Sequence, residues 1–166
     1  TTLETVGDLS SLKEIPYEAF DGCTSLVSIG DLNNVESIAN EAFSNCSALE
    51  HVDKLDKITS IGQNAFKGCT ALKSIGSLHN LETIGQGAFS GCSALEHVDD
   101  LYSLTRLEYD VFSHCVSLIS VDCSDKLTAI GSSAFFGCKA LVSIGDLSNV
   151  TSIESSVFRG CIALKS

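Results

Sequence analysis

The chain has 166 residues, of which 44% are hydrophobic and 19% are charged, so it is long enough to bury one core. Its formal net charge of −11 disfavours binding to nucleic acid and to anionic membrane surfaces, because both carry negative charge themselves. No apolar run reaches the roughly 18 residues that a spanning helix needs, so direct membrane insertion is not expected.

The dominant feature of the sequence is a repeat of 23 residues, which continues along the chain without insertion or deletion. One row of cysteines follows this step: Cys23, Cys46, Cys69, Cys92, Cys115, Cys138 and Cys161. One row of phenylalanines follows it too: Phe20, Phe43, Phe66, Phe89, Phe112, Phe135 and Phe158. We place the repeat starts at residues 3, 26, 49, 72, 95, 118 and 141, so residues 1–166 form a single repeat domain.

Within one repeat, apolar residues first recur at every third position and then follow the pattern Ala42-Phe43-x-x-Cys46. The first set is Leu26, Ile29, Leu32, Val35 and Ile38. A step of three spirals around an α-helix and alternates between the faces of a flat strand, so neither element buries this set. The pattern instead predicts a coil with a short strand, a bend, a second short extended piece and a helical turn at Ala42–Cys46.

A single coil of this kind cannot bury its own apolar side, whereas stacked coils bury it against each other. We therefore predict an α/β-type superhelix of seven coils, with a parallel β-sheet on its concave face and short strands and helical turns elsewhere. The phenylalanine and cysteine rows are expected to form its core, while Phe136 lies outside the row.

The repeat L-x-x-I-x-x-L-x-x-L-x-x-I-x-x-x-A-F-x-x-C, carried for example by residues 72–92, resembles the BspA-like leucine-rich repeats, also called the Treponema pallidum type. The resemblance covers essentially the whole chain and implies a leucine-rich-repeat solenoid. It also implies adhesion and an extracellular or cell-surface location. The family often has a Leu-Pro pair after the first Ile, where this chain has Gly-Asp-Leu or Asp-Lys-Leu, so the bend is expected to differ.

The row of seven cysteines is interpreted as buried free thiols that act as small apolar groups, with disulfide pairing as the lesser alternative. A zinc site is not expected, because there is no C-x-x-C motif and only His114 adjoins a cysteine of the row. Cys123 lies outside the row, beside Ser124, which replaces the usual Leu. It is either an exposed reactive thiol or a half-buried residue that compensates for the missing Leu.

Nothing in the sequence indicates catalysis, because no nucleophile elbow, metalloprotease motif or phosphate loop is present. We expect no catalytic residues, no cofactor and no metal. His51 and His97 share one column two coils apart, roughly 10 Å at strand spacing, which is too far for one metal ion. The acidic columns around Asp53 and Asp99 could hold calcium weakly, although a solvated acidic face is the favoured interpretation.

The residues flanking the first strand vary between repeats while the interior positions barely change, as expected of a scaffold that displays a binding surface. Repeat five adds residue types that are enriched in binding hot spots. The predicted binding residues are His51, Lys73, His97, Asp99, Tyr102, Arg106, Tyr109 and Ile119.

These features predict a non-catalytic binding module that recognises a protein or glycan through its concave face. The alternative is an intracellular scaffold or regulatory interaction domain of the same architecture. Because neither end carries a polar capping unit, we also expect the chain to be a fragment of a longer protein, with any signal or anchor elsewhere.

Overall fold

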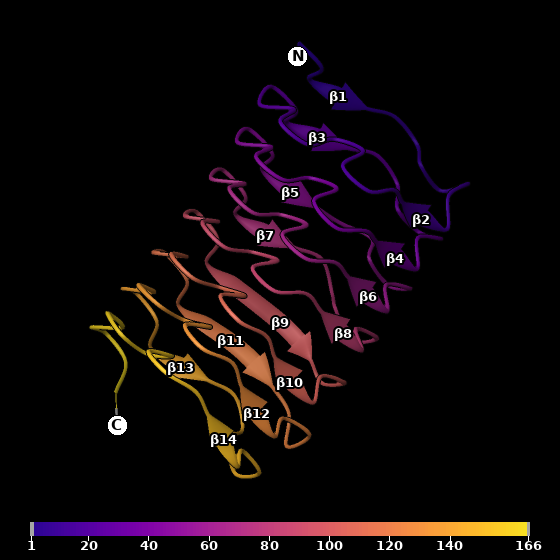
Figure 1. Ribbon diagram of the computed structural model, residues 1–166. Coiled ribbons are helices and arrows are strands. Elements are labelled where there is room, and N and C mark those ends of the chain that lie inside the picture. The colour runs from indigo at the N-terminus through magenta and orange to yellow at the C-terminus, as the bar shows by residue number, and fades with distance from the viewer. Residues whose placement is uncertain (1, 166) are drawn as a thin grey trace.

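The computed structural model describes residues 2–165 and shows a solenoid whose coils stack along one axis (Figure 1). Each coil contributes two short strands, which stack into two columns on different sides of the solenoid. The first column consists of β1 (Thr5–Val6), β3 (Ser28–Ile29), β5 (His51–Val52), β7 (Ser74–Ile75), β9 (His97–Leu101), β11 (Ser120–Cys123) and β13 (Ser143–Ile144). The second column consists of β2 (Glu14–Ile15), β4 (Ser37–Ile38), β6 (Ser60–Ile61), β8 (Thr83–Ile84), β10 (Arg106–Leu107), β12 (Ala129–Ile130) and β14 (Ser152–Ile153).

Strand pairing is parallel throughout, and the register joins residues one repeat apart, except at the ends of β9 and β11. Thr5 pairs with Ser28 in the first column, and Glu14 pairs with Ser37 in the second. Each column holds seven strands, so six turns of about 23 residues separate the first strand from the last. The predicted solenoid and its parallel pairing are therefore confirmed, and each coil contributes one strand to each of the two columns.

The third side of each coil is a run of tight turns, and the predicted helical turn is wrong. The part of the chain that the structure describes contains no helix, and hence none long and apolar enough to cross a membrane. Alternate amides leave the coil: Glu41 N donates to Gln63 O and Phe43 N to Ala65 O, at 2.9 and 2.8 Å. The amides that alternate with these close four-residue turns within the coil, as Ser44 N does by donating to Glu41 O at 3.1 Å.

Backbone conformation on this third side also excludes a helix. Glu41 and Asn45 both have φ of 58°, in the left-handed region that a right-handed helix cannot contain. Because every second N–H points toward the next coil, the turns of successive coils are joined by a ladder of hydrogen bonds, here called the turn ladder. The i, i+3 spacing of Phe43 and Cys46 is shared by a helix and by consecutive turns, so the sequence pattern fitted both.

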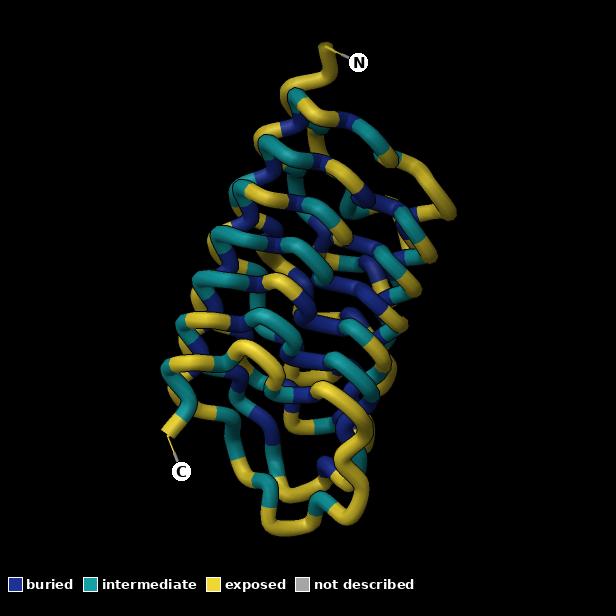
Figure 2. Tube along the Cα trace, turned by 60° about the vertical axis from the view of Figure 1, so that its left-hand side comes forward, coloured by how far each residue is buried: buried dark blue, intermediate teal, exposed yellow. Residues whose placement is uncertain are grey.

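The core is a column of phenylalanine rings that stack face to face along the solenoid axis. Adjacent rings from Phe20 to Phe89 are 5.1–5.2 Å apart between centroids and nearly parallel. The five inner rings are fully buried, whereas Phe20 and Phe158 at the two ends are half-buried. Figure 2 shows that buried segments recur on each coil along the stack. Each inner ring is thus covered above and below by the neighbouring coils.

The cysteine row is confirmed as buried free thiols, with the less buried Cys161 as the one exception. From the second coil onward, each thiol donates to the phenylalanine carbonyl of the preceding coil, as Cys69 Sγ does to Phe43 O at 3.1 Å. That carbonyl also accepts the amide of Cys46 within its own turn, at 3.2 Å. Burial raises the pKa of the Cys46 and Cys138 thiols to about 12.

Cys123 is a core residue, which decides between the two interpretations of this thiol. The register between β9 and β11 shifts by one residue after Val121, so that Cys123 pairs with Leu101. Cys123 thereby occupies the interior position of the missing Leu, and only 4% of its surface is exposed. Burial raises its pKa to about 12, so the exposed reactive thiol is wrong and the compensating structural role is supported.

We predict that Phe89→Ala lowers the free energy of unfolding by about 3–5 kcal/mol, because the lost ring leaves a cavity between two coils. Urea unfolding followed by circular dichroism measures the change. Phe136→Ala is the matched control, because Phe136 lies outside the stack and packs edge-on against His114 at 5.1 Å. A control loss as large as that of Phe89→Ala would contradict the assigned role of the stack.

We predict that one thiol, Cys161, reacts with a disulfide reagent in the native protein at pH 8, and that all eight react in denaturant. The reason is that the other seven thiols are buried and shielded from the reagent, and burial raises the pKa of Cys46 and Cys123 to about 12. Cys161→Ser should abolish the native reaction, and Cys123→Ser should leave it unchanged. A fast native reaction that disappears in Cys123→Ser would show that Cys123 is accessible.

Candidate binding surfaces

The first candidate surface is the outward side of the first strand column together with the residues directly before and after each strand, here called the first-strand face. Strands alternate between an exposed and a buried residue, as His51 and Val52 do in β5. The structure brings five of the predicted binding residues onto this face: His51, Lys73, His97, Asp99 and Ile119.

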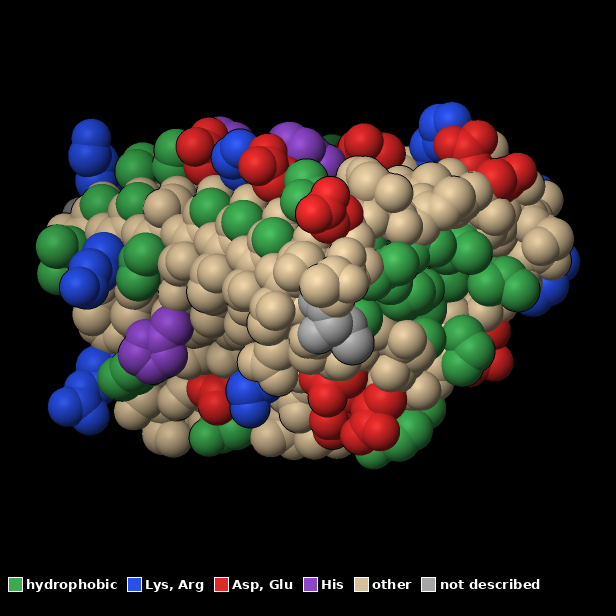
Figure 3. Space-filling model, turned by 90° about the horizontal axis from the view of Figure 1, so that it is seen from above, with side chains coloured by type: hydrophobic (Ala, Val, Ile, Leu, Met, Phe, Trp, Pro, Cys, Tyr) green, Lys and Arg blue, Asp and Glu red, His purple; other side chains and the backbone are tan. Residues whose placement is uncertain are grey.

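Polar side chains on the first-strand face pair between neighbouring coils. His51 Nδ1 lies 2.8 Å from Ser74 Oγ, and His97 Nδ1 lies 2.8 Å from Ser120 Oγ. Lys73 Nζ donates to Glu50 Oε2 at 2.7 Å, which lowers the pKa of that carboxyl group. Figure 3 shows carboxylates, basic groups and imidazoles gathered along one edge of the molecule. The face is therefore a mixed polar surface whose side chains hold one another in place.

Tyr102 lies just beyond the end of β9 and is tied to the acidic column that follows the first strands. Its hydroxyl donates to Asp122 Oδ2 at 2.7 Å, and this bond raises the pKa of Tyr102 to about 12. A shallow cavity of about 310 Å³ beside this column is lined by Asp99, Ser120, Asp122, Ser143 and Gly145, among others. Tyr102 thus extends the first-strand face toward the acidic residues.

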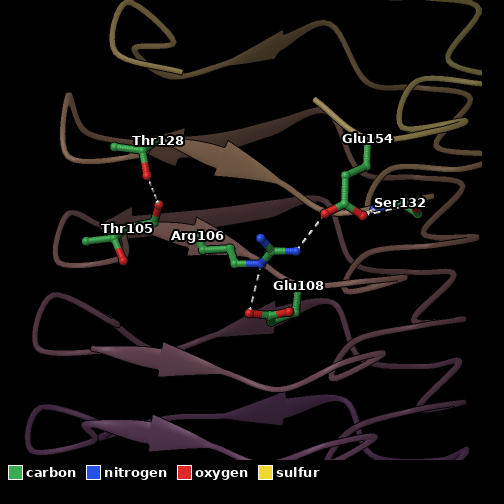
Figure 4. Close-up of polar contacts among 6 residues, drawn as sticks. All are labelled: Thr105, Arg106, Glu108, Thr128, Ser132 and Glu154. Carbon is green, nitrogen blue, oxygen red and sulfur yellow. Dashed lines mark hydrogen bonds and ion pairs between the residues drawn. The ribbon is translucent and has the colours of Figure 1, made fainter. Parts of the chain in front are cut away.

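Arg106 and Tyr109 do not join the first-strand face, so the eight predicted residues do not form one patch. Arg106 belongs to β10 in the second column, where its guanidinium contacts Glu108 at 3.1 Å and Glu154 at 2.8 Å (Figure 4). Glu154 also accepts the amide and the hydroxyl of Ser132, both at 3.0 Å. Tyr109 follows in the turns and is 44% exposed.

A second surface, missed by the sequence analysis, runs over the second strand column and is hollowed. One cavity of about 320 Å³ spans β2, β4, β6 and β8 and includes Tyr17, Ser37, Ser60 and Thr83 in its lining. A neighbouring cavity of about 310 Å³ is lined by Glu36, Lys57, Thr59, Asn80 and Glu82. The signal for this surface was present in the sequence, since small hydroxyl residues recur at positions 37, 60 and 83.

Acidic and imidazole side chains do not gather into a metal site in residues 2–165. Within that range, no group of three or more His, Cys, Asp or Glu residues is placed to hold a metal ion. His51 and His97 are separated by the intervening strand β7, and each imidazole contacts a serine instead.

Comparison of the sequence with known protein families identifies the repeat. The sequence pattern of the BspA type leucine-rich-repeat region, with six copies, matches residues 1–118 and 65–166. The chain belongs to the BspA-type leucine-rich-repeat family. The resemblance noted in the repeat motif is therefore confirmed. None of the curated proteins matches the chain.

Solved structures of this repeat type share the fold. A leucine-rich repeat protein from Eubacterium ventriosum is 32% identical, with a TM-score of 0.86 over 98% of this chain and 44% of that one. A leucine-rich cell surface protein from Faecalibacterium prausnitzii is 26% identical, with a TM-score of 0.53 over 98% and 59%. The Treponema pallidum leucine-rich repeat protein is 27% identical, with a TM-score of 0.62 over 100% and 80%. The chain spans less than two thirds of the first two.

Proposed function

We propose that the chain is a non-catalytic recognition module of a cell-surface protein, which binds a protein or glycan ligand through its first-strand face. The observation that carries this proposal is the contrast between a fixed interior and a changing exterior. Interior rows repeat Phe and Cys in every coil, while the outward column before the first strands reads Val27, Glu50, Lys73, Glu96, Ile119 and Val142.

Order on the first-strand face favours binding, because side chains that are already positioned lose little entropy when a ligand arrives. The histidine–serine pairs and the Lys73–Glu50 pair supply such positioned polar groups. Ile119 and Val142 lie beside each other on adjacent coils and are 39% and 40% exposed, which offers an apolar contact. Polar groups around a small apolar contact are typical of protein recognition surfaces.

A surface location is supported by the similarity to the Faecalibacterium prausnitzii cell surface protein. The alternative, an intracellular scaffold of the same fold, makes the opposite prediction about access. Protease treatment of intact cells that express the parent protein should degrade this segment if it is displayed outside. Complete protection in intact cells, with degradation after lysis, would favour the intracellular alternative.

We predict that Tyr102→Ala and His97→Ala each weaken the affinity for a ligand found on arrays of matrix proteins and glycans by about tenfold or more. Surface plasmon resonance with the folded chain measures the change. Tyr109→Ala is the matched control, because Tyr109 is the same residue type with similar exposure, 44% against 41%, but lies in the turns. Unchanged binding by both first variants, or an equal loss in the control, would place the site elsewhere.

A further inference from the structure

Hydrogen bonding between strands is interrupted at one step of the solenoid, between coil four (residues 72–94) and coil five (residues 95–117). One sheet of each column ends with β7 and β8, and the next begins with β9 and β10. In coil four, Glu82 N donates to Thr59 O at 2.8 Å and Gly85 N to Ile61 O at 2.7 Å. In the described chain, the equivalent amides of Thr105 and Glu108 donate to no backbone carbonyl.

The same two bonds return immediately after coil five. Thr128 N donates to Thr105 O at 2.9 Å, and the hydroxyl of Thr128 reinforces this bond at 3.0 Å, as Figure 4 shows. Gly131 N donates to Leu107 O at 2.8 Å in coil six, and Glu154 N donates to Ile130 O at 3.0 Å in the last coil. On the first-strand side, the Glu96 N to Lys73 O bond that crosses the interruption has lengthened to 3.4 Å. The complete loss of strand pairing is therefore confined to this step.

The turn ladder continues without change across this step. Phe89 N donates to Val111 O at 2.9 Å, and Gly91 N donates to Ser113 O at 2.8 Å. Coils four and five are therefore held together along their turns and part along their strands. The spacing of the ring centroids increases from 5.2 Å between Phe66 and Phe89 to 5.7 Å between Phe89 and Phe112, and it stays at 5.6 and 5.9 Å in the two later steps, so the wider spacing is shared by the whole second half of the stack.

A cavity of about 220 Å³ lies at the separation, on the second-strand side. It is lined by Glu82, Thr83, Ile84, Thr105, Arg106 and Glu108, which are residues of β8, β10 and their immediate neighbours. The lining therefore includes the two strands that have lost their pairing.

The interruption is traced to two positions, one after each strand, where the backbones of neighbouring coils can lie very close together. A Cβ atom at Gly85 would lie 2.4 Å from Gln63 N, and one at Gly30 would lie 2.4 Å from Gly7 O. Coil five has side chains at both positions, Asp99 and Glu108. Every other coil keeps glycine in at least one of them: Gly7, Gly30, Gly62, Gly76, Gly85, Gly131 and Gly145. A single side chain leaves the strands paired: Glu154 keeps its backbone bond, and although the Asp53 amide of coil three donates to no backbone carbonyl in the described chain, β3 and β5 still pair.

We propose that the step between coils four and five is a compliant joint in the solenoid. Residues 2–94 and residues 95–165 are two stiff segments that pivot about the turn ladder, and the strand sides open and close between them. Arg106 stiffens the second segment, because it reaches from coil five to Glu154 in coil seven. The joint divides the first-strand face, with His51 on one side and His97 on the other, so pivoting changes the spacing of these residues.

Hydrogen exchange measured residue by residue by NMR tests the joint, and the chain supplies its own matched pairs. We expect the Glu108 amide to exchange at least about tenfold faster than that of Glu154, and Thr105 at least about tenfold faster than Thr128. Each pair shares a residue type, and Glu154 lies in the last coil, where fraying would act against the prediction. Equal protection within both pairs would overturn the proposal.

A double variant, Asp99→Gly with Glu108→Gly, tests the cause. Removing both side chains lets coil five approach coil four, so the Thr105 amide should become as protected as that of Thr128. Residual dipolar couplings should require two separate orientations for the native segments and one for the double variant. Asp53→Gly, the same replacement in coil three, which already has Gly62, is the control and should change neither measurement. A native protein that fits one rigid orientation would overturn the joint, and unchanged protection of Thr105 in a folded double variant would overturn its cause.

Discussion

The structure depends on one constraint, which is that neighbouring coils must stack at the spacing of paired parallel strands, about 4.8 Å. At that distance, side chains at equivalent positions of neighbouring coils are in contact, so each interior row must consist of groups that pack well against their own kind. Phenylalanine rings meet the requirement by stacking, and cysteines meet it by donating to the carbonyl below. Glycine meets it at positions such as Gly30 and Gly85, where a Cβ atom would lie 2.4 Å from the backbone of the preceding coil.

Much of this followed from the sequence, because a strict repeat converts spacing along the chain into rows in space. The solenoid, the parallel pairing and the buried Phe and Cys rows were all predictable on that ground. The turns were not, since the spacing of Phe43 and Cys46 suits both a helix and a ladder of turns. Cys123 remained ambiguous because its burial depends on a one-residue shift between β9 and β11, and a periodic pattern contains no sign of such a shift.

The candidate surfaces were less predictable than the core, for a related reason. A column of variable residues indicates that its side chains are exposed, but it does not indicate on which side of the coil they lie. Arg106 and Tyr109 share a repeat with Tyr102, yet they lie on the second column and in the turns. Likewise, the loss of strand pairing at coil five depends on Asp99 and Glu108 together, and neither substitution is unusual when considered alone.

The histidine–serine pairs have a consequence for how such a molecule lengthens during evolution. His51 faces Ser74 and His97 faces Ser120, so large and small side chains alternate between coils in this part of the stack. Deleting residues 72–94 would bring the two imidazoles onto adjacent strands, where they would crowd each other. Recombination that gains or loses two coils at once preserves each large–small neighbour relation. In this region, a change of two coils at a time is therefore the change in length that leaves the histidine–serine contacts intact.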